Sequence, residues 1–517
     1  MAATDTSPSL EILAREPEGY SLWDGPPFNN GEPRVKLAKV PCSTSKYSED
    51  GSRLMVIKPD SKISIYDCSS STEIRSFEIP NFLAAALSPR GTYLQTFQKV
   101  STPQEKNVVL WNIETGTPVY QLFQKSMSRT TWPSICFCSD ESVACRMATN
   151  EIQFLDTGDF SRGFTKLRIP GVAAIELSKT PGSHVAAFVA EAKGIPASVQ
   201  IFACGKDAQA QPVARKSFFR CSTVQLIWNH GSTGLLIIAQ SDVDATNQSY
   251  YGESKLHYLT TDGTHEGSVP LRKEGPVHEV RWSSTGAEFA AVYGYMPAKA
   301  TIFNKKCNPL LELGEGPYNT IRWNPKGRYL CLAGFGNLPG DMAFWDYKEK
   351  KLLGSTRAEL SVSSEWSPDG RYFMTATTAP RLQVDNGIKI FHPNGSLLFK
   401  KMFAKLYQAD WKPEAPEKFG DVPELAEAIG SLKIDEKKQS GPGQGSKSSQ
   451  GAKKAAVVNP VAPKPAAYRP PHAKVAASVQ AELFGGGSST EEMSKNALRN
   501  KLKREKQRAK KAAEGGA

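Results

Sequence analysis

The chain has few of the features that mark secreted or membrane proteins. Its nine cysteines among 517 residues are odd in number and scattered, with no histidine at metal-ligand spacing, which argues against a disulfide framework and a zinc site. No apolar run is long enough to span a membrane, and the N-terminus lacks the basic and apolar stretches of a signal peptide. We therefore expect a soluble protein of the cytosol or nucleus, without a membrane partner.

Motifs for catalysis are also missing. The sequence contains no G-x-S-x-G, no H-E-x-x-H and no phosphate-binding G-x-x-x-x-G-K-[ST] motif, and its histidines do not cluster. Gly334–Gly340 imitates a dinucleotide loop, but its third glycine is one residue late and Pro339 precedes a strand. Asp242–Glu253 imitates a calcium loop, but Asn247 stands where glycine is required. We predict no enzyme, no cofactor, no metal and no small-molecule substrate.

What the sequence does contain is a recurring motif: an aromatic or apolar residue, then Ser or Asn, then Pro, Asp and Gly, between two apolar segments. Its copies begin at intervals of 40 to 54 residues, at Tyr47, Leu87, Phe137, Leu177, Trp228, Trp282, Trp323, Trp366 and Trp411. Proline and glycine favour a tight turn, and a period of about 40–45 residues is typical of propeller blades with four strands each. The pattern predicts an all-β, WD-type β-propeller of about nine blades.

The two ends of the repeat array suggest how the ring closes. After Trp411 the ninth blade lacks its other three strands, whereas unused strand-like segments, Leu10–Ala14 and Tyr20–Trp23, precede the first copy. We expect these N-terminal strands to complete the ninth blade, which removes an exposed sheet edge. Arg34–Val40 is expected to lead into the first turn, and the propeller to occupy residues 1–415.

Charge is concentrated at the C-terminus. Residues 437–517 hold seventeen lysines and arginines against five acids, a net charge of +12 that equals that of the whole chain, so residues 1–436 sum to zero. We predict a short amphipathic helical segment at 416–436 and a disordered linker rich in Gly, Ser, Pro and Lys at 437–488. A basic helix follows at 489–513.

The basic helix is the candidate RNA-binding element. Ser489 and Glu492 fit a capping box, and a dense array of cations follows. Such a helix gains free energy by displacing counterions from a phosphate backbone, and without aromatic residues it should have no base specificity. A solubilising tail or a nuclear localisation signal would have the same composition. The predicted RNA-binding residues are Lys495, Arg499, Lys501, Lys503, Arg504, Lys506, Arg508, Lys510 and Lys511.

Several stretches are too particular to be generic blade connections, and they resemble the eukaryotic translation initiation factor 2A family. The resemblance covers nearly the whole predicted propeller and reaches into the basic helix. It rests on Ser241–Glu253, Val292–Phe303, Leu332–Gly340, Ala379–Gly387, Ala467–Pro471 and Ser494–Leu498.

The resemblance implies a cytoplasmic translation initiation factor that binds the small ribosomal subunit and supports recruitment of initiator methionyl-tRNA without GTP. Messenger RNA and other initiation factors are further implied partners. A net-neutral propeller would act as the platform and the tail as the RNA-binding element. From the particular loops we predict ribosome contacts by Tyr250, Tyr251, Tyr295, Lys299, Phe335, Asn337, Arg381 and Asn386.

Three alternatives stay open. A propeller scaffold with a nonspecific basic tail and no tRNA role would share the same fold. The propeller-bearing subunit of initiation factor 3 should carry an RNA-recognition domain before its propeller, and 46 residues before the first motif leave no room for one. An enzyme in the central channel would need acids, bases or metal ligands that converge there.

Overall fold

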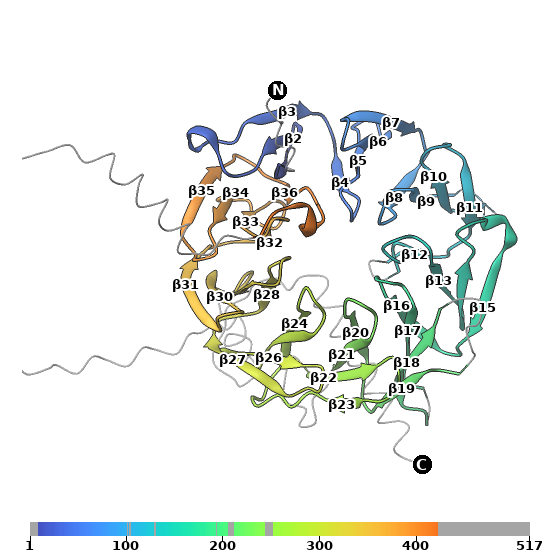
Figure 1. The fold of residues 1–517 in the computed structure, drawn as a ribbon. Coiled ribbons are helices and arrows are strands. Elements are labelled where there is room, and N and C mark those ends of the chain that lie inside the picture. Colours follow the sequence, from blue (N-terminus) through green and yellow to red (C-terminus); the bar gives the residue numbers. More distant parts are fainter. Residues whose placement is uncertain are drawn as a thin grey trace, which may run out of the picture. The chain divides into compact units, whose positions relative to one another are not determined.

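The structure is a computed structural model and describes residues 9–421 apart from 101, 103–104, 129–130, 193, 205–210 and 243–251. In this part of the chain, strands β1 to β36 form nine four-stranded antiparallel sheets that are arranged as a ring (Figure 1). The prediction of a nine-bladed β-propeller is confirmed. The segments predicted at 437–488 and 489–513 lie outside the described residues, as do residues 422–436 of the one predicted at 416–436.

Each blade runs from an inner strand A at the central channel to an outer strand D. Blade 1 is formed by β4 Thr44–Tyr47, β5 Arg53–Ile57, β6 Ile63–Asp67 and β7 Thr72–Phe77, and blade 2 by β8 Phe82–Leu87, β9 Tyr93–Gln98, β10 Val108–Asn112 and β11 Pro118–Leu122. Blade 3 is formed by β12 Cys136–Phe137, β13 Ala144–Ala148, β14 Glu151–Leu155 and β15 Phe164–Arg168, and blade 4 by β16 Val172–Leu177, β17 His184–Val189, β18 Ala197–Ala203 and β19 Ala214–Phe218.

Blades 5 to 8 continue in chain order around the ring. Blade 5 is formed by β20 Thr223–Trp228, β21 Gly234–Ser241, β22 Glu253–Thr260 and β23 Glu266–Ser268, and blade 6 by β24 Val277–Trp282, β25 Glu288–Tyr293, β26 Ala298–Asn304 and β27 Pro309–Gly316. Blade 7 is formed by β28 Thr320–Trp323, β29 Tyr329–Ala333, β30 Asp341–Asp346 and β31 Lys351–Arg357, and blade 8 by β32 Ser363–Trp366, β33 Phe373–Thr377, β34 Gly387–Phe391 and β35 Leu397–Met402. The described helices are three 3-10 turns, η1 Asn29–Gly31, η2 Phe160–Arg162 and η3 Pro416–Lys418, and none is long and apolar enough to cross a membrane.

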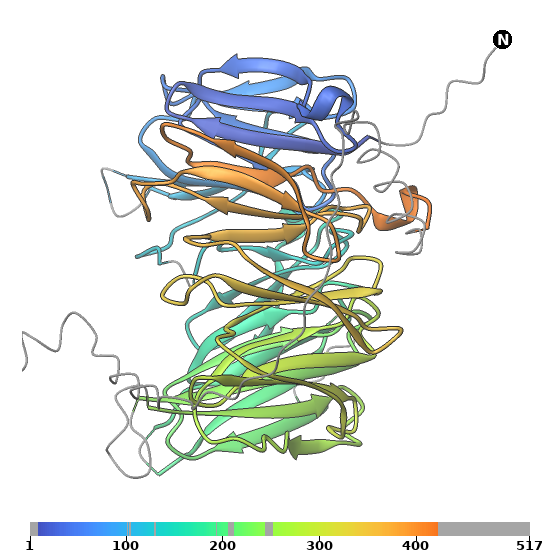
Figure 2. The same ribbon diagram turned by 90° about the vertical axis from the view of Figure 1, so that its left-hand side faces the viewer.

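Blade 9 closes the ring with both ends of the propeller sequence. Its strand A is β36 (Gln408–Trp411), which pairs with β1 (Glu11–Glu16), and β2 (Gly19–Asp24) and β3 (Val35–Val40) follow outward. Figure 2 shows the N-terminal strands in blue beside the last strands in orange. Closure by the N-terminus is therefore confirmed.

The expectation that Arg34–Val40 leads into the first turn is wrong. Val35–Val40 is instead the outermost strand of blade 9, paired with β2, and the separate strand β4 leads into that turn. The pairing is irregular, with register shifts at two points. Blade 9 takes three strands from the N-terminus because β36 supplies only its strand A, and two more strands would leave the blade without strand D.

Aromatic residues of the repeat fill the space between neighbouring blades. The indole Nε1 of Trp282 donates a hydrogen bond to the carbonyl oxygen of Ile227 at 2.9 Å, and that of Trp366 donates to the carbonyl of Arg322 at 2.9 Å. Each bond links a strand A to the strand A of the preceding blade. Trp366 also packs edge-on against Phe344 and Phe373, so one side chain supplies both apolar contact and a specific polar contact.

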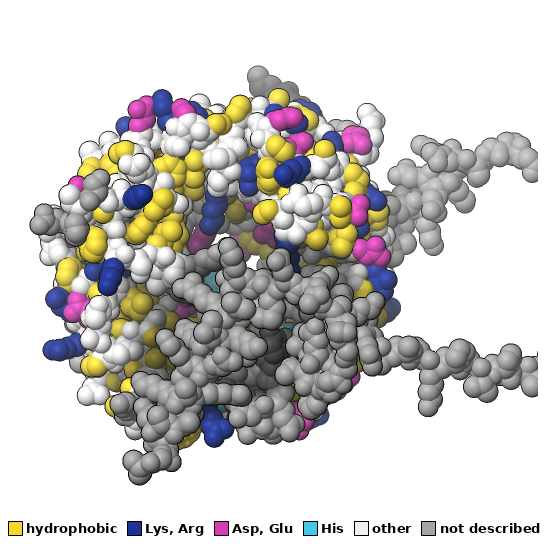
Figure 3. Space-filling view, turned by 180° about the vertical axis from the view of Figure 1, so that it is seen from behind, with side chains coloured by type: hydrophobic (Ala, Val, Ile, Leu, Met, Phe, Trp, Pro, Cys, Tyr) yellow, Lys and Arg dark blue, Asp and Glu magenta, His cyan; other side chains and the backbone are white. Residues whose placement is uncertain are grey.

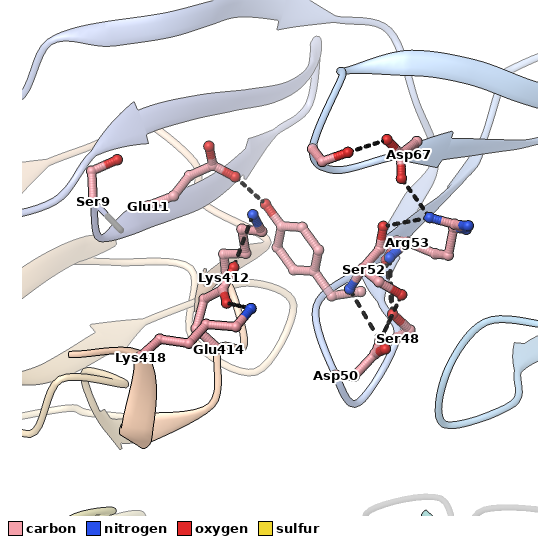
Figure 4. Close-up of polar contacts among 12 residues, drawn as sticks. Ser9, Glu11, Ser48, Asp50, Ser52, Arg53, Asp67, Lys412, Glu414 and Lys418 are labelled. Atoms are coloured by element: carbon pink, nitrogen blue, oxygen red, sulfur yellow. Dashed lines mark hydrogen bonds and ion pairs between the residues drawn. The ribbon is translucent and has the colours of Figure 1, made fainter. Parts of the chain in front are cut away.

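The junction between blades 9 and 1 is also tied by polar side chains (Figure 4). The Tyr47 hydroxyl donates to Glu11 Oε1 at 3.0 Å across the junction, whereas Glu414 pairs locally with Lys412 Nζ at 3.2 Å and Lys418 Nζ at 2.6 Å in the segment that follows β36. Leu13 of β1 is fully buried at this junction, at 0% exposure. The ends of the array thus meet through a core as well as through backbone pairing.

Candidate functional site

The propeller has two faces with different connections. We call turn face the side with the A–B turns, which contain the recurring motif, and the C–D turns. We call loop face the opposite side, with the B–C loops and the D–A connections between blades. Both faces follow from antiparallel strand order, because A and C run toward the turn face and B and D run away from it.

The A–B turns of the turn face bind one another around the channel. Asn229 Nδ2 donates to the carbonyl of Gly286 in the next blade at 3.2 Å, and Asn324 Nδ2 donates to that of Gly370 at 2.7 Å. The backbone N–H of Arg90 donates to Glu141 Oε1 at 2.6 Å. Polar groups of the motif therefore join neighbouring blades, and none of the large hydrophobic side chains exposed in the described residues belongs to an A–B turn.

The chain leaves the propeller on the turn face. After β36, Lys326 Nζ of a blade 7 turn donates to the carbonyl oxygens of Phe419 at 2.7 Å and Gly420 at 2.8 Å. Arg371 Nη2 of a blade 8 turn donates to that of Asp421 at 3.3 Å. In the edge-on view of Figure 2, the end of the described chain, in orange, lies on the same side as the start of β1.

Four of the stretches that look too particular for generic blade connections lie in the propeller and fall together on the loop face; residues 243–251 of the first, and the two stretches after residue 421, lie outside the described residues. They contain the B–C loops of four consecutive blades, 5, 6, 7 and 8. Side-chain amides hold two of these loops. Asn319 binds both the N–H and the carbonyl of Phe335, at 3.0 and 2.8 Å, and Asn386 Oδ1 accepts the N–H of Leu406 at 2.9 Å. The loops are therefore built parts of the fold.

The predicted contact residues divide according to exposure. Tyr295, 54% exposed, lies at the tip of the blade 6 loop, and Asn337 and Arg381 are exposed in the loops of blades 7 and 8. A Cβ atom on Gly336 would lie 2.9 Å from Arg381 Nη2, so Arg381 reaches across to the neighbouring loop. Lys299 pairs with Glu312 at 3.0 Å and is mostly covered.

Two of the predicted residues are not exposed. Phe335 fills the core between blades 7 and 8, and Asn386 is 2% exposed and binds backbone groups, including the carbonyl oxygen of Leu382 at 3.0 Å. The expectation that their side chains are exposed is wrong, because both hold the loops in place, and a ribosome contact by these residues stays a prediction. Tyr250 and Tyr251 lie outside the described residues.

The sequence analysis missed most of the apolar surface of the loop face. Phe219 is 87% exposed and Val384 is 61% exposed. Figure 3 shows this face, and on its uncovered part hydrophobic side chains lie among basic, acidic and polar ones. No pattern distinguishes these residues from core residues in the sequence, because they are spread singly or in pairs over loops and strand ends of different blades. The exposed apolar residues of this face are Leu83, Phe123, Met127, Ile195, Phe219, Tyr295, Met296, Leu360, Val384 and Met402.

Charged side chains line the channel between blades 6 and 9, around a cavity of about 420 Å³. Glu279 lies 3.2 Å from Arg322 Nη1 and 2.9 Å from Arg281 Nη2. Burial, and next the negative charge of Asp410, raise the pKa of Glu365 to about 7. In the described part of the chain, no three His, Cys, Asp or Glu side chains are placed to hold a metal ion.

Comparison with known proteins identifies relatives of this chain. The pattern of the family described as "Eukaryotic translation initiation factor eIF2A" matches residues 216–409. Eukaryotic translation initiation factor 2A of Schizosaccharomyces pombe is 37% identical over 388 residues, which are 74% of this chain and 66% of that protein. The protein of the same name from Dictyostelium discoideum is 31% identical over 444 residues, 85% of this chain and 71% of that protein.

A solved structure supports the same relation. This chain is similar to a protein described under "Crystal structure of the eukaryotic initiation factor", with a TM-score of 0.69 and 32% identity over 79% of this chain and 99% of that chain. The relatives are named as translation initiation factors and do not represent a known class of enzyme. Together with the nine-bladed propeller, these similarities show that the chain belongs to the eukaryotic translation initiation factor 2A family.

Proposed function

We propose that this protein binds the small ribosomal subunit through the loop face of its propeller and supports recruitment of initiator methionyl-tRNA. It does so in the cytoplasm without binding GTP itself. The observation that carries the proposal is the contrast between the connections of the loop face, where exposed apolar side chains gather, and the described A–B turns, where no large apolar side chain is exposed. Exposed apolar residues set among polar ones are typical of protein interaction surfaces.

The basic tail supplies the second half of the proposal. The propeller is net neutral, whereas residues 437–517 carry a charge of +12. The chain leaves the propeller on the turn face, next to Lys326 and Arg371. Tethering to the propeller raises the tail's effective concentration at RNA near the bound subunit.

The proposal is tested by binding of the full-length protein to purified small subunits across a salt series. Val384→Asp places a charge on the exposed loop face and should weaken binding about tenfold or more, because an unpaired charge is costly to bury at an interface. Val213→Asp is the matched control: Val213 is exposed at 41% beside the turn face, and its substitution should leave binding unchanged.

The tail is tested in the same assay by replacing its nine predicted RNA-binding residues with glutamine. We expect the salt dependence of binding to flatten by about 0.7–0.9 units of slope for each lost phosphate contact. Initiator tRNA, but not elongator tRNA, should compete. Equal effects of Val384→Asp and Val213→Asp, with tail binding indifferent to the RNA competitor, would favour a propeller scaffold with a nonspecific basic tail and no tRNA role.

A further inference from the structure

A second feature of the loop face is a groove beside blade 3. It encloses a cavity of about 520 Å³, within the range of about 300–1,000 Å³ that is usual for small-molecule sites. The groove is bounded by the D–A connection that follows β11, the β13–β14 turn and the first residues of β16. It lies across blades 2 to 4, away from the four B–C loops described above.

The groove is cationic. Lys125 and Arg146 are among the described residues that line it, and no Asp or Glu is among them. Arg146 Nε donates to Gln153 Oε1 at 2.7 Å, which orients the guanidinium group without neutralising it. The nearby Glu151 lies 3.7 Å from Lys166 Nζ. Because neither Lys125 nor Arg146 forms an ion pair within the described residues, both can meet an anionic group.

Ser134, which lines the same cavity, has a buried hydroxyl. Ser134 is 7% exposed, its backbone N–H donates to Gln95 Oε1 at 2.7 Å, and its Oγ has no hydrogen-bond partner among the described residues. Buried polar atoms in proteins are nearly always hydrogen-bonded. The partner of this hydroxyl is therefore a water or a polar group of a ligand held in the groove.

An aromatic ring completes the groove. Phe123 is a lining residue and is 46% exposed, close in sequence to Lys125. Unpaired bases stack on exposed aromatic side chains, and their phosphates bind nearby cations. We propose that this groove binds one unpaired nucleotide of single-stranded RNA, with the base on Phe123, the phosphate at Lys125 and Arg146, and a ribose or base polar atom at Ser134 Oγ.

A nucleotide fits these residues better than an acidic peptide does, because a carboxylate side chain has no ring to stack on Phe123. The inference rests on the proposed function, since it supplies a specific RNA contact within a factor that works among ribosomal, messenger and transfer RNA. It differs in kind from the basic helix predicted at 489–513, which has cations for phosphates and no aromatic residue, whereas the groove combines charge with a stacking surface.

The test uses the full-length protein and a six-nucleotide RNA with one 4-thiouridine, crosslinked by light and mapped by mass spectrometry. Mapping separates crosslinks in the groove from crosslinks in the tail. We expect Phe123→Ala and Arg146→Gln to lower groove crosslinking about fivefold or more and to leave tail crosslinking unchanged. Ser134→Ala should also lower groove crosslinking, and it should not unfold the protein because the hydroxyl has no hydrogen-bond partner in the described part of the chain.

Matched controls lie on the same face. Phe219→Ala removes a more exposed ring in the D–A connection between blades 4 and 5, and Lys106→Gln removes an exposed cation of the blade 2 loop. Neither should change groove crosslinking. The inference would be overturned if no groove crosslinks formed, or if the control substitutions reduced them as much as the groove substitutions do. It would also be overturned if an equimolar acidic peptide of six residues competed with the RNA and abolished the groove crosslinks.

Binding of the same proteins to small ribosomal subunits is measured in parallel. Wild-type binding to the subunit without groove crosslinks would overturn the nucleotide site alone. Groove crosslinks without any binding to the subunit would contradict the proposed function and leave an RNA-binding groove.

Discussion

The two faces of this propeller differ in how regular they are and in what they expose. On the turn face, copies of one motif form similar turns that bind their neighbours through side chains such as Asn229 and Asn324. On the loop face, each connection has its own length and sequence, and apolar side chains such as Phe219 and Val384 are exposed. The comparison indicates that one face holds the ring together and that the other is free to bind partners.

The largest effect should come from breaking the ring at its closure. Leu13 is completely buried where blade 9 meets blade 1, so Leu13→Ala should lower the free energy of unfolding by about 2–5 kcal/mol. Leu37→Ala is the control, since Leu37 on the outer strand of the same blade is 37% exposed. Urea unfolding of both variants measures the difference in free energy of unfolding. Equal losses of stability in the two variants would contradict the central role that the structure gives to β1 in closing the ring.

The next prediction makes the same substitution on each face. Asn324 is buried, and its side chain binds the carbonyl of Gly370 at 2.7 Å and the N–H of Lys326 at 3.0 Å. Asn324→Ala should therefore cost about 1–3 kcal/mol of stability, because it leaves buried polar groups unpaired. Asn337→Ala on the exposed blade 7 loop should change stability by no more than about 0.5 kcal/mol.

Binding should show the opposite order. Asn337→Ala is expected to weaken binding to the small ribosomal subunit a few-fold, and Asn324→Ala to leave it unchanged at a temperature where the variant is folded. Thermal unfolding and subunit binding are measured on the same preparations. If Asn324→Ala lowered binding more than Asn337→Ala did, the division of work between the faces would be wrong.

The sequence predicts the regular part of the molecule better than the irregular part. Repeated turns around residues such as Trp282 and Trp366 reveal the blade count, because each copy has to solve the same packing problem between two blades. The N-terminal closure could also be predicted, since a ninth motif without following strands needs strands from elsewhere. The outer strand Val35–Val40 was missed, and it pairs with register shifts and carries little of the core.

Site residues were harder to predict because unusual loops contain both functional and structural side chains. Phe335 and Asn386 stand in such loops and turn inward to support them, whereas Tyr295 turns outward. The groove on blade 3 depends on Ser134 and Arg146 from separate elements, and only the three-dimensional structure brings them together. Contacts of this kind depend on blade geometry and not on any short motif.

The smallest effect is expected between the two faces, in the channel. Burial and the neighbouring carboxylate of Asp410 raise the pKa of Glu365 from 4.5 to about 7. A carboxyl group with a raised pKa in the folded state contributes stability while it is protonated, and that contribution is lost as the pH rises from about 4.5 through 7. Glu365→Gln removes this titration. The free energy of unfolding of the wild type, relative to that of the variant, should therefore decrease as the pH rises over this range.

The size of this difference should be modest, since Glu365 keeps contact with solvent in the channel and solvent screens its charge. Urea unfolding midpoints of both proteins at several values between pH 4.5 and 8 measure it. Asp410→Asn is the matched change, because it removes the repelling charge, keeps Glu365, and should reduce the same pH dependence in part. Parallel curves for wild type and Glu365→Gln would show that the channel carboxylates titrate normally and that, unlike the two faces, the channel makes no distinct contribution.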